Sequence, residues 1–151
     1  LQPPFSMIRR DVAEAEIPWC AAHGAGVVVY SPMQSGLLTD SFTADRVAAF
    51  PADDWRRSSP QHQSPALERN LALRDALRPI AAKHGVSVAA VAVAWTLAWP
   101  GVTGAIAGSS GCVVWRTMRS SSGLQACTIR DDGLTAASGS ADRWVVRTGR
   151  S

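Results

Sequence analysis

Residues 26–39, with the sequence GVVVYSPMQSGLLT, constrain the fold of this chain more than any other stretch. The apolar run at residues 27–29 is β-branched throughout, and it predicts a short strand buried on both faces. Pro32 ends the strand, because it has no N–H with which to continue a β-ladder. α/β proteins bind ligands where such buried parallel strands open into loops, at the carboxyl end of the strand. The stretch therefore predicts an α/β protein with a candidate ligand loop, although its local sequence fits an ordinary strand–loop junction as well.

The order of the helical and strand patterns supports the α/β assignment. Pro3 and Pro4 make the start of the chain extended, because a proline excludes its predecessor from the α region. Helices are then expected at residues 11–23, 66–84 and 88–99, and further strands at residues 27–30 and 102–107. This alternation predicts a parallel sheet with helices outside it. Three strands are too few to close a barrel, so residues 1–110 are interpreted as a portion of a larger α/β domain.

Local signals predict the ends and faces of these helices. His23-Gly24 and His84-Gly85 are stop signals, in which glycine takes a left-handed conformation, so both histidines are interpreted as cap residues rather than catalysts. Ser87 is expected to cap the helix that follows it. The apolar stripe predicted for the helix at residues 66–84 has five members: Leu73, Leu77, Ile80, Ala81 and His84.

A long stretch without clear periodicity covers residues 38–65. Loops of that length in compact domains are usually functional lids or disordered segments. The charged cluster DDWRR at residues 53–57 lies within it. We interpret this cluster either as part of a lid or as a solvated surface patch of ion pairs.

The charge distribution argues against a nucleic-acid or membrane partner. Residues 1–110 carry nine basic and nine acidic side chains, whereas residues 111–151 carry six Arg and three Asp and so account for the net charge of +3. No stretch is long and apolar enough to span a bilayer, and no secretory signal pattern opens the chain. The three cysteines have no metal-ligand spacing, so no metal site is expected, and idle thiols fit a reducing, cytoplasmic location.

The sequence changes character after residue 110. Residues 111–151 contain no Pro, Lys or Glu and show no sustained helical or strand period. The run of serines ending in Gly123 would interrupt a helix. We therefore expect residues 1–110 to form one domain and residues 111–151 to be an irregular tail, either flexible or translated from a shifted reading frame.

Four stretches of the chain resemble the C-terminal half of bacterial aldo-keto reductases, in the same order and spacing: QPPFSMIRRDVAEAEIPWC, GVVVYSPMQSGLLT, DDWRRSSP and VAVAWTLAWPGVTGAIAGSS. The resemblance covers about residues 1–110. It implies a partial (β/α)₈ TIM barrel, with residues 1–6 as the sixth strand, residues 27–30 as the seventh and residues 103–107 as the eighth. It also implies an oxidoreductase that reduces aldehydes and ketones with NADP(H).

The resemblance implies cofactor-binding roles for ten residues. Gln2 matches the residue that hydrogen-bonds the nicotinamide carboxamide, and Tyr30 matches the aromatic residue that stacks on the nicotinamide ring. The loop that wraps the pyrophosphate is matched by Ser31, Pro32, Met33, Gln34 and Ser35. The start of the segment around the adenosine 2′-phosphate is matched by Gly108, Ser109 and Ser110.

The chain departs from the family pattern in two respects. The family's catalytic Asp, Tyr, Lys and His precede the part that is matched here, and the sole tyrosine of this chain, Tyr30, aligns with the stacking residue. Arg116 and Arg119 are off the spacing of the family's basic clamp on the 2′-phosphate, so NAD is an alternative to NADP(H). We therefore expect no catalytic residue in the chain and an inactive isolated protein. The alternatives are a non-catalytic nucleotide-binding or subunit-interaction remnant and a non-functional truncated product.

Overall fold

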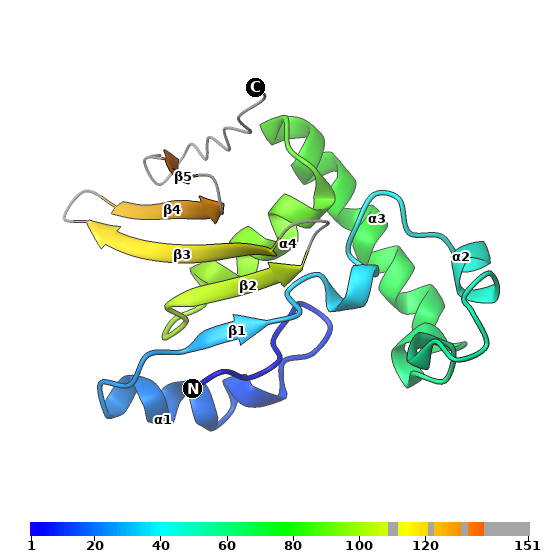
Figure 1. Ribbon diagram of the computed structural model, residues 1–151, viewed down its shortest axis with the longest axis horizontal. Coiled ribbons are helices and arrows are strands. Elements are labelled where there is room, and N and C mark those ends of the chain that lie inside the picture. The colour runs from blue at the N-terminus through cyan, green and yellow to red at the C-terminus, as the bar shows by residue number, and fades with distance from the viewer. Residues whose placement is uncertain (109–111, 121–122, 131–132, 138–151) are drawn as a thin grey trace. The chain divides into compact units, whose positions relative to one another are not determined.

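Figure 1 shows the computed structural model of the 151-residue chain. The structure describes residues 1–108, 112–120, 123–130 and 133–137. The chain divides into two compact units, of which unit 1 comprises Leu1–Pro32 with Ala92–Ser151 and unit 2 comprises Met33–Val91.

Unit 1 is built on a five-stranded sheet with the strand order β1-β2-β3-β4-β5 (Figure 1). The strands are β1 (Val28–Tyr30), β2 (Gly104–Gly108), β3 (Cys112–Ser120), β4 (Gly123–Arg130) and β5 (Gly133–Ala137). β1 and β2 pair in parallel and every later pair is antiparallel, so the sheet is mixed rather than purely parallel as predicted. The strands expected at residues 27–30 and 102–107 are confirmed as β1 and β2, and the α/β fold is confirmed with them.

The first residues of the chain run extended and parallel beside β1. Leu1 and Pro3 accept hydrogen bonds through their carbonyls from the N–H groups of Val28 and Tyr30, at 2.9 and 3.0 Å. The N–H of Phe5 donates to the carbonyl of Tyr30 at 3.1 Å, and this ladder includes one parallel bridge between Pro4 and Tyr30. The extended start predicted from the two prolines is confirmed.

The helix predicted at residues 11–23 is divided in two, because a 3-10 turn, η1 (Asp11–Ala13), precedes α1 (Glu16–Ala22). His23 ends α1, and its ring Nδ1 lies 2.8 Å from the carbonyl of Trp19. Gly24 follows with φ +67°, as the stop signal predicts. Pro18 lies in the first turn of α1, which begins at Glu16, and its missing N–H costs nothing there.

An aromatic cluster packs α4 (Val88–Ala98) against the first segment of unit 1. The ring of Phe5 is 1% exposed and stacks on Trp95 at a centroid distance of 5.4 Å. It also meets Trp99 edge-on at 5.4 Å. Burying such large rings contributes strongly to stability, and pairs of this geometry add about 0.5–1.5 kcal/mol each beyond area burial.

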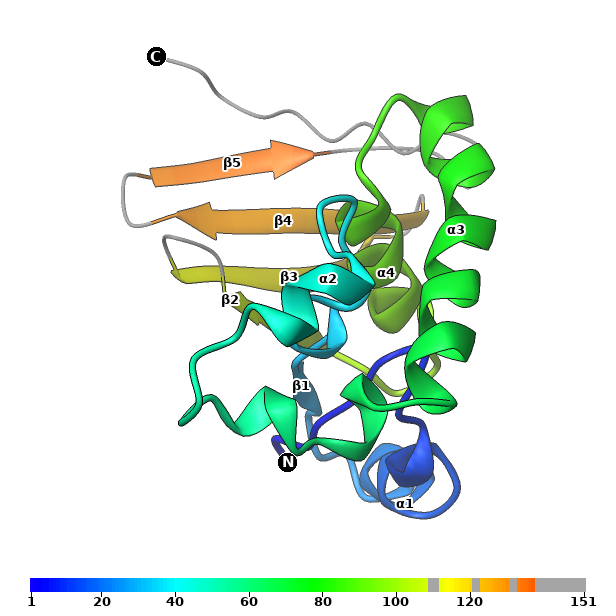
Figure 2. The ribbon, with the colours of Figure 1, turned by 90° about the vertical axis from the view of Figure 1, so that its right-hand side faces the viewer.

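The irregular tail expected after residue 110 is wrong for the part that the structure describes. β3, β4 and β5 form an antiparallel meander, and Figure 2 shows them side by side. Only two residues separate β3 from β4 and β4 from β5, which is the commonest length for a hairpin connection. The run of serines ending in Gly123 would interrupt a helix, but it is equally compatible with a hairpin turn. Antiparallel strands can pair across such a short connection. The domain division at residue 110 and the shifted reading frame stay predictions.

Unit 2 contains one long helix and several short ones. α3 (Ala66–His84) has the bounds predicted for it, and Gly85 ends it in a left-handed conformation with φ +64°. The stretch at residues 38–65 is not uniformly irregular: the short elements of this unit are η2 (Gln34–Gly36), α2 (Ala44–Ala48), η3 (Trp55–Arg57) and η4 (Pro60–His62). Among the described residues no single helix is long and apolar enough to cross a membrane, although α3 and α4 together reach the required length across a bend.

The apolar stripe predicted for α3 is correct at Leu77 and Ala81, which are buried, but it is wrong at two other positions. Ile80 is 45% exposed and His84 is exposed as well, whereas Asn70 and Arg74 are buried. The buried row comprises Leu67, Asn70, Arg74, Leu77 and Ala81. Apolar character alone misplaces this row, because two of its members are polar residues that are buried with hydrogen-bond partners.

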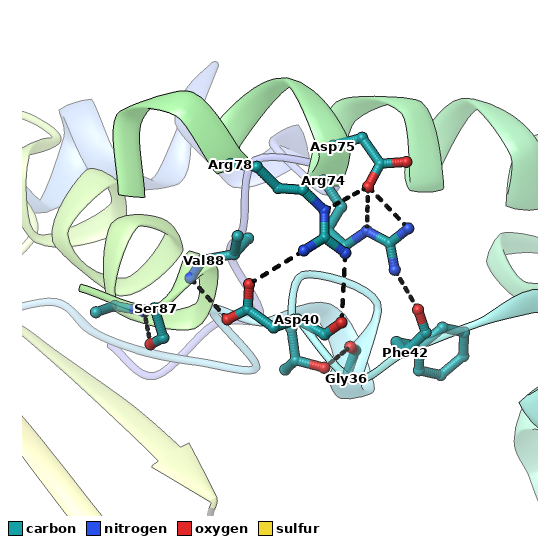
Figure 3. Close-up of polar contacts among 10 residues, drawn as sticks. Gly36, Asp40, Phe42, Arg74, Asp75, Arg78, Ser87 and Val88 are labelled. Carbon is teal, nitrogen blue, oxygen red and sulfur yellow. Dashed lines mark hydrogen bonds and ion pairs between the residues drawn. The ribbon is translucent and has the colours of Figure 1, made fainter. Parts of the chain in front are cut away.

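A polar network joins the segment after η2 to α3 (Figure 3). Arg78 donates to the carboxylate of Asp75 at 2.8 Å and lies 3.6 Å from that of Asp40. Arg74 contacts the same carboxylate oxygen of Asp75 at 2.9 Å and donates to the carbonyl of Phe42. The hydrogen bond from Arg78 and the neighbouring Arg74 together lower the pKa of Asp75. The network therefore keeps the loop at residues 40–42 against the helix.

Candidate functional site

The strand pairing of unit 1 sorts side chains onto two faces of the sheet. The bridge of Pro4 to Tyr30 and the pairing of Tyr30 with Ile106 place these three residues on one face, because bridge partners point the same way. Alternation adds Gln2, Val28 and Gly104 to that face. The opposite face is the buried one, and four of its members are at most 1% exposed: Phe5, Val27, Val29 and Ala105. The face with Gln2 and Tyr30 is thus the more open of the two.

Tyr30 lies at the carboxyl end of β1, where the chain leaves the sheet. Its side chain is 40% exposed, while the neighbouring Val29 is fully buried. Its hydroxyl has no hydrogen-bond partner among the described residues. A large ring left open at the end of a buried strand can present its face to a planar ligand.

Gln2 lies on the strand-like segment beside β1, and its side chain is exposed. Its amide group likewise has no partner in the described ranges. The structure thus brings Gln2 and Tyr30 to one face of adjacent extended segments, as a carboxamide-binding and a stacking residue would require.

The backbone after β1 is strained, which the sequence did not reveal. Ser31, Gln34 and Ser35 have φ values of 56°, 46° and 54°, in the left-handed region that residues other than glycine rarely occupy. Such conformations cost of order 1–3 kcal/mol each and cluster at ligand-binding sites. The left-handed turn at Ser31 directly follows Tyr30 and fixes the direction in which the backbone leaves the strand. The three positions are occupied by serine and glutamine rather than glycine, so the amino-acid composition did not indicate a left-handed backbone here.

Thr103, which precedes β2, is hydrogen-bonded to Val27, the residue before β1. Its hydroxyl donates to the carbonyl of Val27 at 2.8 Å and accepts from the N–H of Val27 at 3.0 Å. The N–H of Thr103 donates to the same carbonyl at 2.8 Å. A threonine before a strand is too common for the sequence alone to predict such a contact.

The remaining predicted site residues are distributed over both units and beyond the described part. Pro32 is buried in unit 1, and Met33 opens unit 2. Gln34 and Ser35 lie in η2, and both are partly exposed. Gly108 ends β2. Ser109 and Ser110 lie outside the described residues, so the 2′-phosphate segment stays a prediction.

The charged cluster of residues 53–57 forms an ion pair within unit 2. Asp54 caps η3 by accepting from the N–H of Arg56 at 3.0 Å, and its carboxylate also receives the guanidinium at 2.5 Å. These hydrogen bonds lower the pKa of Asp54 to about 2 and raise that of Arg56. The Arg56 guanidinium also lies over the ring of Phe50, 4.0 Å from its centroid. The expected ion pair is confirmed between Asp54 and Arg56, but it is half-buried rather than solvated. The lid interpretation stays a prediction.

The described part of unit 1 carries groups that could bind a ligand. The described residues contain no group of three or more His, Cys, Asp or Glu that could hold a metal. Cys20 is free and 3% exposed. The open features of unit 1 are an aromatic ring, an amide and a strained turn, which suit the recognition of a planar, polar ligand.

The family model described as the Aldo/keto reductase family matches residues 1–112. That is most of the chain, and it includes both parallel strands. The chain belongs to the aldo/keto reductase family.

Relatives and one solved structure support this membership. The chain is 30% identical over 110 residues to the aldo-keto reductase YhdN of Bacillus subtilis (strain 168), an alignment covering 72% of this chain and 33% of that protein. It is 32% identical over 113 residues to a probable voltage-gated potassium channel subunit beta of Oryza sativa subsp. japonica, covering 72% and 34%. The glycerol dehydrogenase AKR11B4 of Gluconobacter oxydans superposes with a TM-score of 0.62 at 37% identity, covering 67% of this chain and 30% of that one.

This aldo/keto reductase chain therefore spans about a third of the length of the curated relatives it matches. The resemblance inferred from the sequence is confirmed, and so is an oxidoreductase-like relationship.

Proposed function

We propose that this chain supplies part of the nicotinamide dinucleotide site of an NADP(H)-dependent aldo-keto reductase that converts aldehydes and ketones to alcohols. The single observation that carries the proposal is Tyr30, an open aromatic ring at the carboxyl end of a buried parallel strand. Family membership supplies the class of cofactor, since aldo-keto reductases typically bind nicotinamide cofactors. The bound dinucleotide would provide the hydride for carbonyl reduction.

The residues of unit 1 fit the nicotinamide end of such a cofactor. Tyr30 would present its ring face to the nicotinamide ring, and Gln2, on the same face of the sheet, would hydrogen-bond the carboxamide. Flat stacking would hold the ring so that one side faces the substrate, which is a positioning effect. Ser31 and Pro32 would begin the turn around the pyrophosphate, whose backbone amides suit an anion.

The roles assigned to the rest of the loop and to the end of β2 extend this proposal along the sequence. Met33, Gln34 and Ser35 would continue the turn around the pyrophosphate. Gly108, Ser109 and Ser110 would begin the segment around the adenosine 2′-phosphate, which distinguishes NADP from NAD. In a complete (β/α)₈ barrel, the segment at residues 1–6, β1 and β2 would be strands six, seven and eight.

The chain is proposed to lack the group that protonates the carbonyl oxygen. Tyr30 is its sole tyrosine and is assigned to stacking, so no tyrosine is left to act as the general acid that the family resemblance implies. Losing a positioned general acid removes roughly 10²–10⁴-fold of rate. The isolated chain should therefore bind cofactor without turning over substrate. The cytoplasmic location inferred from its cysteine content belongs to the same proposal.

One observation favours a second candidate, a role in subunit interaction. A cavity of about 620 Å³ in unit 1 opens beside the exposed side chains of Leu1 and Trp19, which are 56% and 59% exposed. Its lining comprises Leu1, Ala15, Glu16, Trp19, Cys20 and Ala25. Exposed apolar surface of this kind occurs at contacts between proteins. The rice relative is named as a channel subunit, which is a protein that works in an assembly.

Saturation-transfer NMR with NADPH, NADH and adenosine 2′,5′-bisphosphate distinguishes these candidates. The proposal predicts saturation of the nicotinamide ring protons of NADPH by the chain. Saturation of the adenosine end alone would contradict the stacking role of Tyr30, and no saturation with any nucleotide would leave subunit interaction as the better candidate. A parallel assay with a reactive aldehyde should give no NADPH oxidation above a blank without protein, and steady oxidation would contradict the missing general acid.

A further inference from the structure

His62 is buried in unit 2 without a partner for either ring nitrogen. It ends η4 and is 1% exposed. Neither Nδ1 nor Nε2 has a hydrogen-bond partner in the part of the chain that the structure describes. Burying a polar group without a hydrogen bond is costly, and burying a charged one costs far more. The site therefore holds the imidazole as an aromatic ring rather than as a polar group.

Three aromatic rings surround the imidazole. Phe42, Phe50 and Trp55 meet it at centroid distances of 5.8, 6.4 and 6.1 Å. The interplanar angles are 60°, 66° and 81°, so each contact is edge-to-face. We call the four residues Phe42, Phe50, Trp55 and His62 the aromatic clasp. The rings come from four separate points of the stretch at residues 38–65.

Polar contacts anchor the elements around the clasp but do not reach the His62 ring. Asn70 of α3 donates to the backbone carbonyl of Gln61 at 2.9 Å, and Arg74 donates to the carbonyl of Phe42. Arg57 of η3 donates to the carbonyl of Phe50 at 3.3 Å. These bonds fix the backbone at three of the points from which clasp rings extend or that adjoin them. The ring contacts of His62 then join these segments to one another.

Burial and the charge of Arg56 oppose the protonation of His62. Burial is the main reason why its pKa is lowered, and the Arg56 guanidinium lowers it further, while Asp54 acts in the opposite direction. The carboxylate of Asp54 is hydrogen-bonded to the backbone N–H and the guanidinium of Arg56, and among the described residues neither His62 ring nitrogen has a hydrogen-bond partner. Several charged residues of the neighbouring helices are exposed: Asp45 and Arg46 on α2, Arg57 on η3, and Glu68 and Arg69 on α3. Arg74 of α3 is buried, but its guanidinium donates to the carbonyl of Phe42 and pairs with Asp75, so it offers no acceptor to His62.

We propose that His62 makes the aromatic clasp an acid-sensitive latch, closed while the imidazole is neutral and opened when it takes up a proton. An imidazolium would place two N–H donors among three rings without an acceptor, so protonation requires the ring to leave the clasp. Its departure removes one partner from each of the three ring contacts and frees Trp55, which is already 62% exposed. The proposal concerns unit 2 alone and does not rest on the proposed function.

The direction of the pH dependence follows from proton linkage. A histidine whose pKa is lowered in the closed state binds fewer protons there than in the open state. The closed state is therefore fully stable above the ordinary pKa of 6.5 and loses stability as the pH falls below that value. The ratio of open to closed clasp should rise by up to about fivefold between pH 6.5 and pH 5.5.

The test is an NMR titration of the full chain from pH 7.5 to pH 5.0, with 5-fluorotryptophan reporting on Trp55. The Trp55 signal is identified by its loss in Trp55→Phe. It should move from a closed to an open position as the pH falls and return when the pH is restored. His62→Phe keeps an aromatic ring without a titrating group and should abolish the change, while His84→Gln, a change at an exposed histidine, should leave it intact.

Two results for the Trp55 signal would overturn the proposal. One is a Trp55 signal that stays in the closed position down to pH 5.0, and the other is the same pH response in His62→Phe. The ring carbon of ¹³C-labelled His62 in the unaltered chain provides a second readout that needs no variant. Its chemical shift should report protonation of the imidazole over the same pH range in which the Trp55 signal moves. Protonation of the ring inside an unmoved clasp would also overturn the proposal.

Discussion

The carboxylate of Asp40 accepts a hydrogen bond from the backbone N–H of Val88 at 3.0 Å, although 48 residues separate them in sequence. Val88 is the first residue of α4, and Ser87 accepts from the N–H of Ala90 at 3.2 Å at the same helix end (Figure 3). The cap expected at Ser87 is confirmed, and Asp40 adds a second, distant one. A carboxylate also suits the positive end of a helix dipole. The start of α4 is therefore fixed by the loop that follows η2.

Removing the distant cap should destabilise the chain. Asp40→Ala is expected to lower the free energy of unfolding by about 0.5–2 kcal/mol, the usual effect of losing a capping side chain. Asp40→Asn should lose less, because its amide oxygen can still accept the hydrogen bond. Urea denaturation measures both values. Asp53→Ala, at an exposed aspartate without a partner among the described residues, is the matched control, and an equal loss in that control would contradict the capping role.

Arg74 should be far more sensitive to substitution than the neighbouring surface arginine. It is 8% exposed and donates to the carbonyl of Phe42. Arg74→Met would keep most of its apolar stem but leave that carbonyl unsatisfied, at a cost of about 1–3 kcal/mol in the free energy of unfolding. Arg69→Met, on the exposed side of α3, should change it by less than about 0.5 kcal/mol. Equal losses in thermal or urea unfolding would show that the buried hydrogen bond contributes nothing.

Gly101 should not tolerate a side chain. It has φ +91°, and an added Cβ would lie 2.7 Å from Cγ2 of Ile17, a residue that is 1% exposed. Gly24→Ala is the matched control, because Gly24 has φ +67° but nothing lies within 4 Å of its added Cβ. We expect Gly24→Ala to cost about 1 kcal/mol from the left-handed backbone alone. Gly101→Ala should cost about 1–3 kcal/mol more, from overpacking, and equal melting temperatures for the two variants would argue against the close contact.

The sequence predicted local structure better than long-range contacts. α3 has the predicted bounds, because a helical pattern and the His84-Gly85 stop signal are both local. The position of Tyr30 at a strand end also followed from the apolar run and the proline after it. The partners of Asp40, Arg74 and Thr103 could not be predicted, because each contact spans more than 30 residues and depends on the tertiary fold.

Two other differences have physical causes of their own. The predicted stripe of α3 omitted Arg74, because a charged residue is rarely buried unless a partner satisfies it, and that partner lies on a distant loop. The strained turn at Ser31 escaped notice because left-handed backbone is normally signalled by glycine. In the candidate site, the sequence therefore identified the ring of Tyr30 but not the backbone conformation that directs the chain away from it.

The dissociation constant of NADPH for the chain and its Tyr30 variants, measured by NMR titration of backbone amides at residues 28–35, tests the central claim most directly. Stacking uses the ring face rather than the hydroxyl, so Tyr30→Phe should bind like the unaltered chain. Tyr30→Ala should bind roughly 2- to 13-fold more weakly, because an aromatic pair contributes about 0.5–1.5 kcal/mol beyond area burial. Trp19→Ala, at an exposed aromatic residue of the same unit, should bind normally. If folded Tyr30→Phe loses as much affinity as Tyr30→Ala, or if the unaltered chain shows no shifts at these residues, the stacking role assigned to Tyr30 is wrong.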